Sequence, residues 1–426
     1  MYIKKSQIFL CRSEYRMSRS SKPSSGFRRE LMRLEQVASR RMTRRSALMD
    51  FAQKLVHGRR GRRALAFLST AGDSPAAKFL RHKIFEASHR IEFERSDPAT
   101  RFTVGAKSSA PEAPLTDESW WQSRERIAQL FADFRFDGVL DTEVLRSALV
   151  ETVESAMYWQ AADGQDTLYA DPLLSKAMSG IAEQVASMGG YAGWGTQAAA
   201  SAQWMVSWRG EDSEGTWQPG MEPANSQLKE WKTRVHQDEL RHRKNLTSEM
   251  SDVMSNSWWS TPPGGLYRSY SRPVGLAPLG LDCVEDGLGW KQATIQRLEI
   301  AQSKPVFEIS EPDDWANLCQ RYPLDVSGTM RGCWCETTGR DGQWVQPDWL
   351  SVAQDYDGVH LSLGAYLSGA GEGIPVGPTV ATVVAGWNPD ETFWFTDAVK
   401  PVGAAEAWEV FDYSAHEQWR RSGEDR

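Results

Sequence analysis

The sequence is poor in cysteine, has no long apolar run and lacks the compact motifs of several common enzyme classes. Five Cys among 426 residues is a sparse, odd number, which argues against a disulfide framework. It favours a reducing compartment, so we expect a cytoplasmic protein. No stretch approaches the ~18 apolar residues of a membrane span, so we expect no membrane contact. No Gly-x-Gly-x-x-Gly, phosphate loop, Gly-x-Ser-x-Gly or His-Glu-x-x-His occurs, so nucleotide-binding, serine-hydrolase and zinc-protease functions lose their usual support.

A structural zinc site is also not predicted. The one close cysteine pair, Cys333 and Cys335, has the spacing Cys-x-Cys. Structural zinc sites usually need Cys-x₂₋₄-Cys and a second pair of ligands. No second pair lies near it in the sequence, so we assign no metal ligands and leave any cofactor unknown on this evidence.

Charge is distributed unevenly along the chain. Residues 1–115 hold 25 of the 49 Lys and Arg residues but only 10 of the 56 Asp and Glu residues, which gives +15 there and −22 on the rest. A basic arm beside an acidic body is typical of contact with nucleic acid. Nucleic acid is therefore a possible partner of residues 1–115, but the arm can equally fold against the acidic body or be partly disordered.

The pattern of residues predicts an α+β fold in four parts. Residues 1–115 form a basic, partly disordered arm with amphipathic helices and a linker at 96–115, and we expect residues 116–426 to fold without it. Residues 116–255 form a helical domain, residues 256–412 a Trp-rich α+β domain, and residues 413–426 a polar tail.

Helix signals dominate the second part. Asp141 or Thr142 caps a helix over 142–160, and Asp171 with Pro172 opens another over 172–187. Apolar periodicity predicts further helices over 196–208 and 224–254. In the third part, short β-branched and aromatic segments between Gly and Pro predict strands, with only two short helices, at 311–322 and 347–354. The sheet is expected to be mixed or antiparallel.

Tryptophan is abundant, with 19 residues. Its large apolar area and single N–H donor suit both a core and an aromatic binding cleft, and the core is the commoner use.

A few polar residues on predicted strands are candidates for a functional site. Alternation places Arg268 and Tyr270 on one strand face, where Arg can clamp an anion, although an exposed charged face explains them equally well. His360 faces away from Val359 and Leu361, so it is either a general base in a cleft or a hydrogen-bonded residue within the sheet. Glu391 begins a late strand, where it either stabilises a cation or lies in a solvated turn.

The chain resembles an uncharacterised, mainly actinobacterial protein family over about residues 116–412. The resemblance rests on Thr-Gly-Arg-Asp-Gly at 338–342, Pro-Asp-Trp at 347–349, Asp-Gly-Val-His-Leu at 357–361 and Gly-Trp-Asn-Pro-Asp at 386–390. The family implies no activity. The chain departs from the family at 331–335, where Arg-Gly-Cys-Trp-Cys stands in place of Arg-His-Asp-Trp-Tyr.

A looser resemblance is to ADP-ribosyltransferases, small α+β domains in which an early Arg or His, a central aromatic residue and a late Glu hold NAD. This resemblance makes Arg268, His360 and Glu391 the candidate catalytic residues. It makes Tyr270 and Tyr366 the candidate NAD-binding residues.

Two functions follow from these observations. The first is an intracellular interaction module with a protein partner, in the manner of a toxin-antitoxin or defence component. The alternative is an NAD-dependent ADP-ribosyltransferase-like enzyme with a cleft in the C-terminal domain. Convergence of Arg268, His360 and Glu391 on one cleft would favour the enzyme.

Overall fold

The computed structural model describes residues 48–95, 117–188, 202–209, 219–244, 257–412 and 418–423. Predictions for residues 1–47, for the linker at 96–115 and for most of the tail lie outside this part of the chain. The residues from Asp50 onwards group into one compact unit. Within the described part, no helix is both long enough and apolar enough to cross a membrane.

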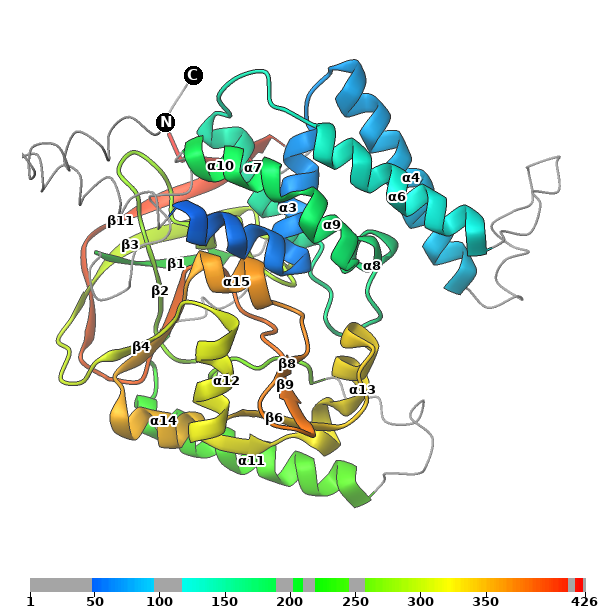
Figure 1. The fold of residues 1–426 in the computed structure, drawn as a ribbon. Coiled ribbons are helices and arrows are strands. Elements are labelled where there is room, and N and C mark those ends of the chain that lie inside the picture. The colour runs from blue at the N-terminus through cyan, green and yellow to red at the C-terminus, as the bar shows by residue number, and fades with distance from the viewer. Residues whose placement is uncertain are drawn as a thin grey trace, which may run out of the picture. The chain divides into compact units, whose positions relative to one another are not determined.

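Helices dominate the described chain up to residue 188 (Figure 1). They are α3 (Arg59–Thr70), α4 (Pro75–Arg95), α6 (Asp117–Asp133), α7 (Thr142–Glu154), α8 (Gly164–Tyr169), α9 (Pro172–Ala177) and α10 (Ser179–Met188). Asp141 caps α7 by accepting from the Val144 amide at 2.8 Å. Asp171 caps α9, whose first residue is Pro172. These caps confirm the two predicted helix starts, although α7 ends at Glu154, earlier than predicted.

Eight strands form a mixed sheet in the order β12-β11-β3-β1-β2-β10-β7-β4. They are β1 (Gln203–Arg209), β2 (Arg268–Ser271), β3 (Gln292–Ile300), β4 (Val306–Ile309), β7 (Gly358–Leu361), β10 (Glu391–Trp394), β11 (Val399–Asp412) and β12 (Gln418–Arg421). Only the β4–β7 pair is parallel among them. This sheet and the helices confirm the predicted α+β class.

A four-stranded sheet and several helices complete the described fold. The strand order of this second sheet is β5-β6-β9-β8. The elements are β5 (Pro323–Asp325), β6 (Gln343–Pro347), β8 (Ile374–Pro375), β9 (Val380–Thr382), the 3₁₀ helix η3 (Leu279–Leu281), α11 (Ala224–Lys244), α12 (Pro312–Arg321), α13 (Ser327–Thr338), α14 (Trp349–Asp355) and α15 (Leu363–Gly369). Helices α13 and α15 are additional to the two short helices predicted there.

The helix predicted over 196–208 is wrong where the structure describes it. Residues 203–209 form β1, which pairs with β3 over seven positions and with β2 on its other side. The strand comes from the part of the chain predicted to be helical and lies in the middle of the main sheet.

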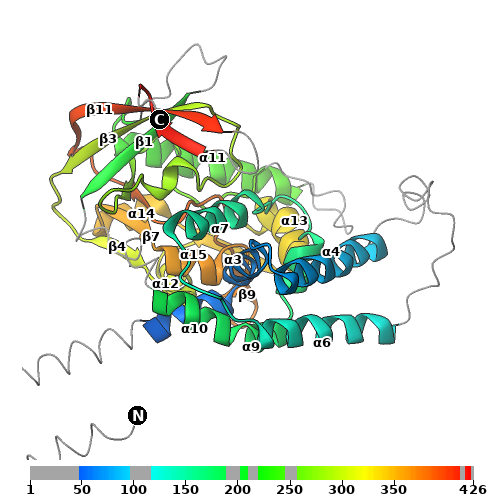
Figure 2. The ribbon, with the colours of Figure 1, turned by 90° about the horizontal axis from the view of Figure 1, so that it is seen from above.

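Part of the predicted basic arm belongs to the core. Helix α3 packs against both α7 and α15. Figure 2 shows α15 beside α3. Its Ala64 and Leu65 are fully buried. Gly58 lies so close to α15 that a Cβ there would come within 2.5 Å of the Ser368 carbonyl oxygen. We therefore withdraw the expectation that residues 1–115 can be removed without unfolding the rest.

Tryptophan fills the interior, as the commoner interpretation of its abundance predicts. Six Trp side chains are fully buried, namely Trp315, Trp334, Trp344, Trp349, Trp387 and Trp394. Several contact one another edge to face, as Trp334 and Trp344 do with ring centroids 5.5 Å apart. These large rings bury much apolar area in the core.

Candidate functional site

The structure brings three of the five predicted site residues together at the centre of the main sheet. Tyr270 on β2 lies directly opposite Glu391 on β10. The Tyr270 hydroxyl donates to Glu391 Oε1 at 2.6 Å, and Arg268 Nη1 lies 3.5 Å from the same oxygen. Burial raises the pKa of Glu391, and the charge of Arg268 opposes this rise. The guanidinium of Arg268 also lies over the rings of Trp208 and Phe393.

His360 lies on the other face of the same sheet. It is opposite Thr392, the neighbour of Glu391, and adjacent residues of a strand point to opposite faces. This confirms that His360 faces away from Val359 and Leu361. It also means that His360 does not share a cleft with Arg268 and Glu391.

Two carboxylates hold the His360 ring in a buried row. Nδ1 lies 2.5 Å from Glu308 Oε2 and Nε2 lies 3.2 Å from Asp390 Oδ1. Burial by itself lowers the pKa of His360, but the hydrogen bonds to Asp390 and Glu308 outweigh it and raise the pKa to about 9. The imidazolium therefore donates from both nitrogens at neutral pH, which makes His360 a structural cation rather than a general base.

Tyr366 lies in a third place, on α15 beside Glu285. The two groups are close enough for the Tyr366 hydroxyl to lower the pKa of Glu285, but burial is the larger effect and raises this pKa to about 8. Glu285 Oε2 accepts from the Gly386 amide at 2.6 Å. The Glu285 amide in turn donates to Asn388 Oδ1 at 3.0 Å.

The loop at 386–390 connects these places and supplies residues beyond the five predicted site residues. Asn388 Nδ2 donates to the Tyr270 hydroxyl at 3.0 Å, and Asp390 Oδ2 accepts from the Ser271 amide at 2.9 Å. Gly386 and Asp390 both have positive φ, 76° and 64°. The Gly-Trp-Asn-Pro-Asp pattern was the available signal, because Gly and Asp tolerate this backbone region.

Metal binding has no support in this arrangement. Across the described ranges, no three His, Cys, Asp or Glu side chains are placed to hold an ion. Glu308 and Asp390 illustrate the reason, because they bind opposite nitrogens of one ring and do not converge on a point.

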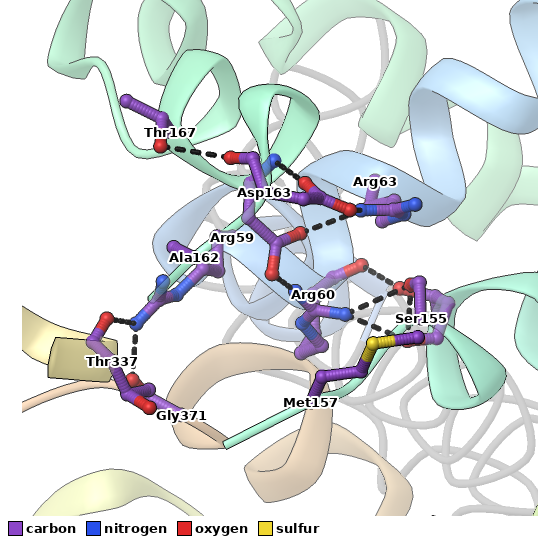
Figure 3. A network of polar contacts seen from close by, with 12 residues as sticks. Arg59, Arg60, Arg63, Ser155, Met157, Ala162, Asp163, Thr167, Thr337 and Gly371 are labelled. Carbon is purple, nitrogen blue, oxygen red and sulfur yellow. Dashed lines mark hydrogen bonds and ion pairs between the residues drawn. The ribbon is translucent and has the colours of Figure 1, made fainter. Parts of the chain in front are cut away.

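A second polar region is built by α3, whose four arginines are all buried. Figure 3 shows Arg59 directed at the carbonyls of Thr337 and Gly371, with Arg60 and Arg63 directed at α7 and α8. Arg62 donates to main-chain carbonyls, including that of Val56 at 2.7 Å. These arginines are therefore committed to internal partners.

The nucleic-acid hypothesis loses part of its basis through these contacts. Arg60 and Arg63 both contact Asp166, and Arg59 Nε lies 3.6 Å from Glu372. Some of the basic residues counted in 1–115 thus pair with acidic residues of the fold. The sequence analysis left this open as the alternative in which the arm folds against the acidic body. For residues 1–47 the hypothesis stays a prediction.

A large groove lies between the helices and the main sheet. Its volume is about 1020 Å³, and its walls come from α3, α4, α7, the loop at 275–282, β11 and β12. None of the five predicted site residues lines it. Sequence reasoning missed the groove because its walls come from segments more than 300 residues apart.

Aromatic side chains line both sides of this groove. Trp408 on β11 and Trp419 on β12 are partly buried, whereas Phe85 on α4 is 65% exposed. The guanidinium of Arg421 lies over Trp408 at 5.8 Å. Such aromatic side chains, partly covered and partly open to solvent, are the commonest anchors at binding surfaces.

The charged side chains that line the groove are balanced, with Arg63, Arg81 and Arg146 against Glu143, Glu151 and Asp282. Arg63 contacts Asp163 at 2.9 Å, Asp166 at 2.8 Å and Glu151 at 3.7 Å, and Arg60 shares Asp166 with it. Arg146 is held by Asp282 through two contacts of 2.7 Å. That ion pair is electrically neutral.

Comparisons with protein-family models, with curated proteins and with solved structures found no match to this chain.

Proposed function

We propose that the protein is a binding module that holds a polypeptide segment of a partner protein in the groove between its helices and its main sheet. The observation that carries this proposal is the groove of about 1020 Å³ with aromatic side chains on both sides. Ligand sites have volumes of roughly 300–1,000 Å³ and occur preferentially between structural units. A groove of this size at such a position fits a segment of chain.

The aromatic lining supports a protein partner. Trp408 and Trp419 offer rigid apolar area at a low cost in side-chain entropy, and Phe85 leaves most of its ring exposed. Exposed apolar rings around a hollow are typical of a surface that a second chain covers.

The enzyme alternative has less support from the geometry. Arg268 and Glu391 lie on the face of the sheet opposite His360, so the three side chains do not form one reacting centre. Glu391 Oε1 already accepts from Tyr270 at 2.6 Å.

Selection of peptides tests the proposal. A library of random linear peptides of about twelve residues, displayed on phage, is selected on the full chain. The enriched peptides are then synthesised and measured on three proteins: the wild type, Ser147→Trp and Ser187→Trp. Ser147 lines the groove, so Trp there fills it, whereas Ser187 is exposed at the end of α10 and serves as the matched control.

The proposal expects enriched peptides to bind the wild type and Ser187→Trp equally. Binding to Ser147→Trp is expected to weaken by about tenfold or more. Circular dichroism checks that each variant is folded. Failure to enrich any peptide above an empty support, or equal binding by Ser147→Trp, would overturn the proposal.

A further inference from the structure

A single arginine joins the two walls of the groove. Arg146 on α7 lines the groove from the helical side and is buried. Ala277, Leu281 and Asp282, in the loop at 275–282, line it from the sheet side. Contacts between Arg146 and this loop therefore connect the helical wall to the sheet wall.

Four hydrogen bonds hold Arg146 to the loop. Its Nε and Nη2 donate to the two carboxylate oxygens of Asp282, each at 2.7 Å. Nη1 donates to the Ala277 carbonyl at 3.0 Å, and Nη2 also donates to the Pro278 carbonyl at 2.9 Å. A planar guanidinium that binds a carboxylate through two bonds fixes the orientation of its partner as well as its distance.

The loop is in turn attached to the main sheet. Trp208 on β1 donates its Nε1 to the Leu281 carbonyl at 3.3 Å. Arg272, directly after β2, donates its Nε to the Leu276 carbonyl at 2.9 Å. The loop thus moves with the sheet wall, and Arg146 connects that wall to α7.

The loop is preceded by a tight turn that reaches into solvent. The Leu276 amide donates to the Pro273 carbonyl at 3.1 Å, and Gly275 has a φ of 79°, as the third residue of a type II turn does. Val274 at the tip of the turn is fully exposed. Two of the four bonds of Arg146 reach the residues that directly follow this turn, so they hold the exposed end of the loop.

We propose that Arg146 sets the separation of the two groove walls and is the positioning residue for binding between them. This inference rests on the proposed function, because it names the residue that shapes the same groove. A groove already shaped for its occupant avoids part of the free-energy cost of ordering on binding. Without Arg146 only a fraction of the molecules have correctly spaced walls, and the apparent affinity falls by that fraction.

A distance measurement across the groove tests the wall separation without any partner. Val274→Cys on the turn and Glu143→Cys on α7, both at exposed positions, each carry a nitroxide spin label. The labels are placed in the Cys11→Ser chain, because the cysteines of the described ranges are buried. Pulsed electron paramagnetic resonance is expected to give one narrow distance distribution with Arg146 present and a broader one in Arg146→Gln.

A second variant guards against a loss of folding in Arg146→Gln. Arg146→Lys keeps the positive charge beside Asp282 but has no planar fork, so it is also expected to broaden the distribution. Arg81→Gln is the matched control, because Arg81 lines the groove but donates to the Thr70 and Gly72 carbonyls of its own wall. Circular dichroism checks that each variant is folded. A distribution that stays narrow in the folded Arg146 variants would overturn the inference.

Binding kinetics connect the wall separation to affinity. The tightest-binding synthetic peptide from the library selection is measured on the wild type, Arg146→Lys and Arg81→Gln. Arg146→Lys is expected to lower the association rate constant about tenfold and to leave the dissociation rate constant nearly unchanged, because fewer molecules are competent to bind. Arg81→Gln is expected to match the wild type.

Other roles of Arg146 predict other kinetics. Loss of a direct contact with the peptide would raise the dissociation rate constant and leave association unchanged. A role in overall stability alone would lower the melting temperature and change neither rate constant. Either result would refute the positioning role of Arg146.

Failure of this inference is distinguishable from failure of the proposed function. If the distance distribution stays narrow without Arg146, other contacts hold the walls, and the inference fails whatever binds in the groove. If Ser147→Trp binds the peptide normally, or no peptide is enriched, the proposed function fails and the role of Arg146 in binding fails with it. The distance distribution still decides in that case whether Arg146 sets the wall separation.

Discussion

At the scale of single residues, His360 makes the stability of the protein depend on pH. Its pKa is about 9 in the folded state and 6.5 as an ordinary His, so folding favours the protonated ring. The stabilisation is fully present below pH 6.5 and is lost as the pH rises to 9. From the difference between the two pKa values, this stabilisation is on the order of 3 kcal/mol.

We expect the free energy of unfolding of the wild type to fall between pH 6.5 and 9, measured by urea denaturation across that range. His360→Ala leaves Glu308 and Asp390 without the cation between them, so it is expected to cost about 3–5 kcal/mol at pH 6 and much less at pH 9.5. A loss that is the same at both pH values would contradict the charged state of His360.

Glu285 is a second buried group that titrates in an unusual range. Burial raises its pKa to about 8, against 4.5 in an exposed chain, so the folded state favours the neutral acid. The neutral Glu285 therefore stabilises the folded state fully below pH 4.5. This contribution to the free energy of unfolding declines as the pH rises to 8, by an amount on the order of 5 kcal/mol. Glu285→Gln removes this titration at nearly constant shape.

The Glu285→Gln variant is expected to be about as stable as the wild type at pH 4.5 and more stable at pH 8.5. Thermal melting at the two pH values measures this, with the exposed Glu299→Gln on β3 as control. If Glu285→Gln melts below the wild type at pH 8.5, the carboxylate is ionised and held by partners, and the interpretation fails.

At the scale of elements, α3 is held by buried ion pairs as well as by apolar packing. Arg60 is fully buried, contacts Asp166 and donates to the Thr152 carbonyl at 2.9 Å. Removal of one partner of a buried pair leaves the other charge without full compensation. Arg60→Met is therefore expected to cost about 3–5 kcal/mol of unfolding free energy in urea.

The matched control for α3 is Arg135→Met, because Arg135 is exposed in the loop after α6. Exposed positions usually change the unfolding free energy by less than about 0.5 kcal/mol. A cost below about 1 kcal/mol for Arg60→Met would mean that the arginines of α3 are dispensable to the core.

The elements also show what the sequence could predict and what it could not. Caps at Asp141 and Asp171 are local, so the starts of α7 and α9 were predictable. Helix α13 could not be predicted, because its residues are buried on nearly every side and give no amphipathic period. Strand β1 could not be predicted either, because pairing with β3 and β2 overrides the helical preference of the neighbouring sequence.

The candidate sites show the same limit. The alternation of β7 was enough to place His360 on the face opposite Val359 and Leu361. Its partners were not predictable, because Glu308 lies 52 residues away. Tyr270 and Glu391 are 121 residues apart, and a single sequence contains no signal that pairs them. The groove is a still longer-range feature, since it depends on how α4, α7 and β12 meet.

At the scale of the whole molecule, one apolar cluster joins the helices to strands β4, β7 and β10 of the main sheet. One cluster of buried side chains includes Leu149 on α7 and Val359 on β7. Arg146 on α7 binds Asp282 next to η3, and Arg59 on α3 binds the Gly371 carbonyl. Contacts of this kind couple the helices to the sheet, whereas the predicted boundary at residues 255 and 256 implies two separable domains.

We expect the helices and the sheet to unfold in a single cooperative transition, because the shared core cannot be lost by one part alone. Leu149→Ala opens a cavity in the fully buried core and is expected to cost about 2–5 kcal/mol. Far-ultraviolet circular dichroism reports mainly the helices and Trp fluorescence mainly the sheet side, and both midpoints in urea should fall together. Val139→Ala, at a residue 83% exposed, should move neither signal. If Leu149→Ala lowers the circular dichroism midpoint and leaves the fluorescence midpoint unchanged, the two parts unfold independently and the chain has a domain boundary between them.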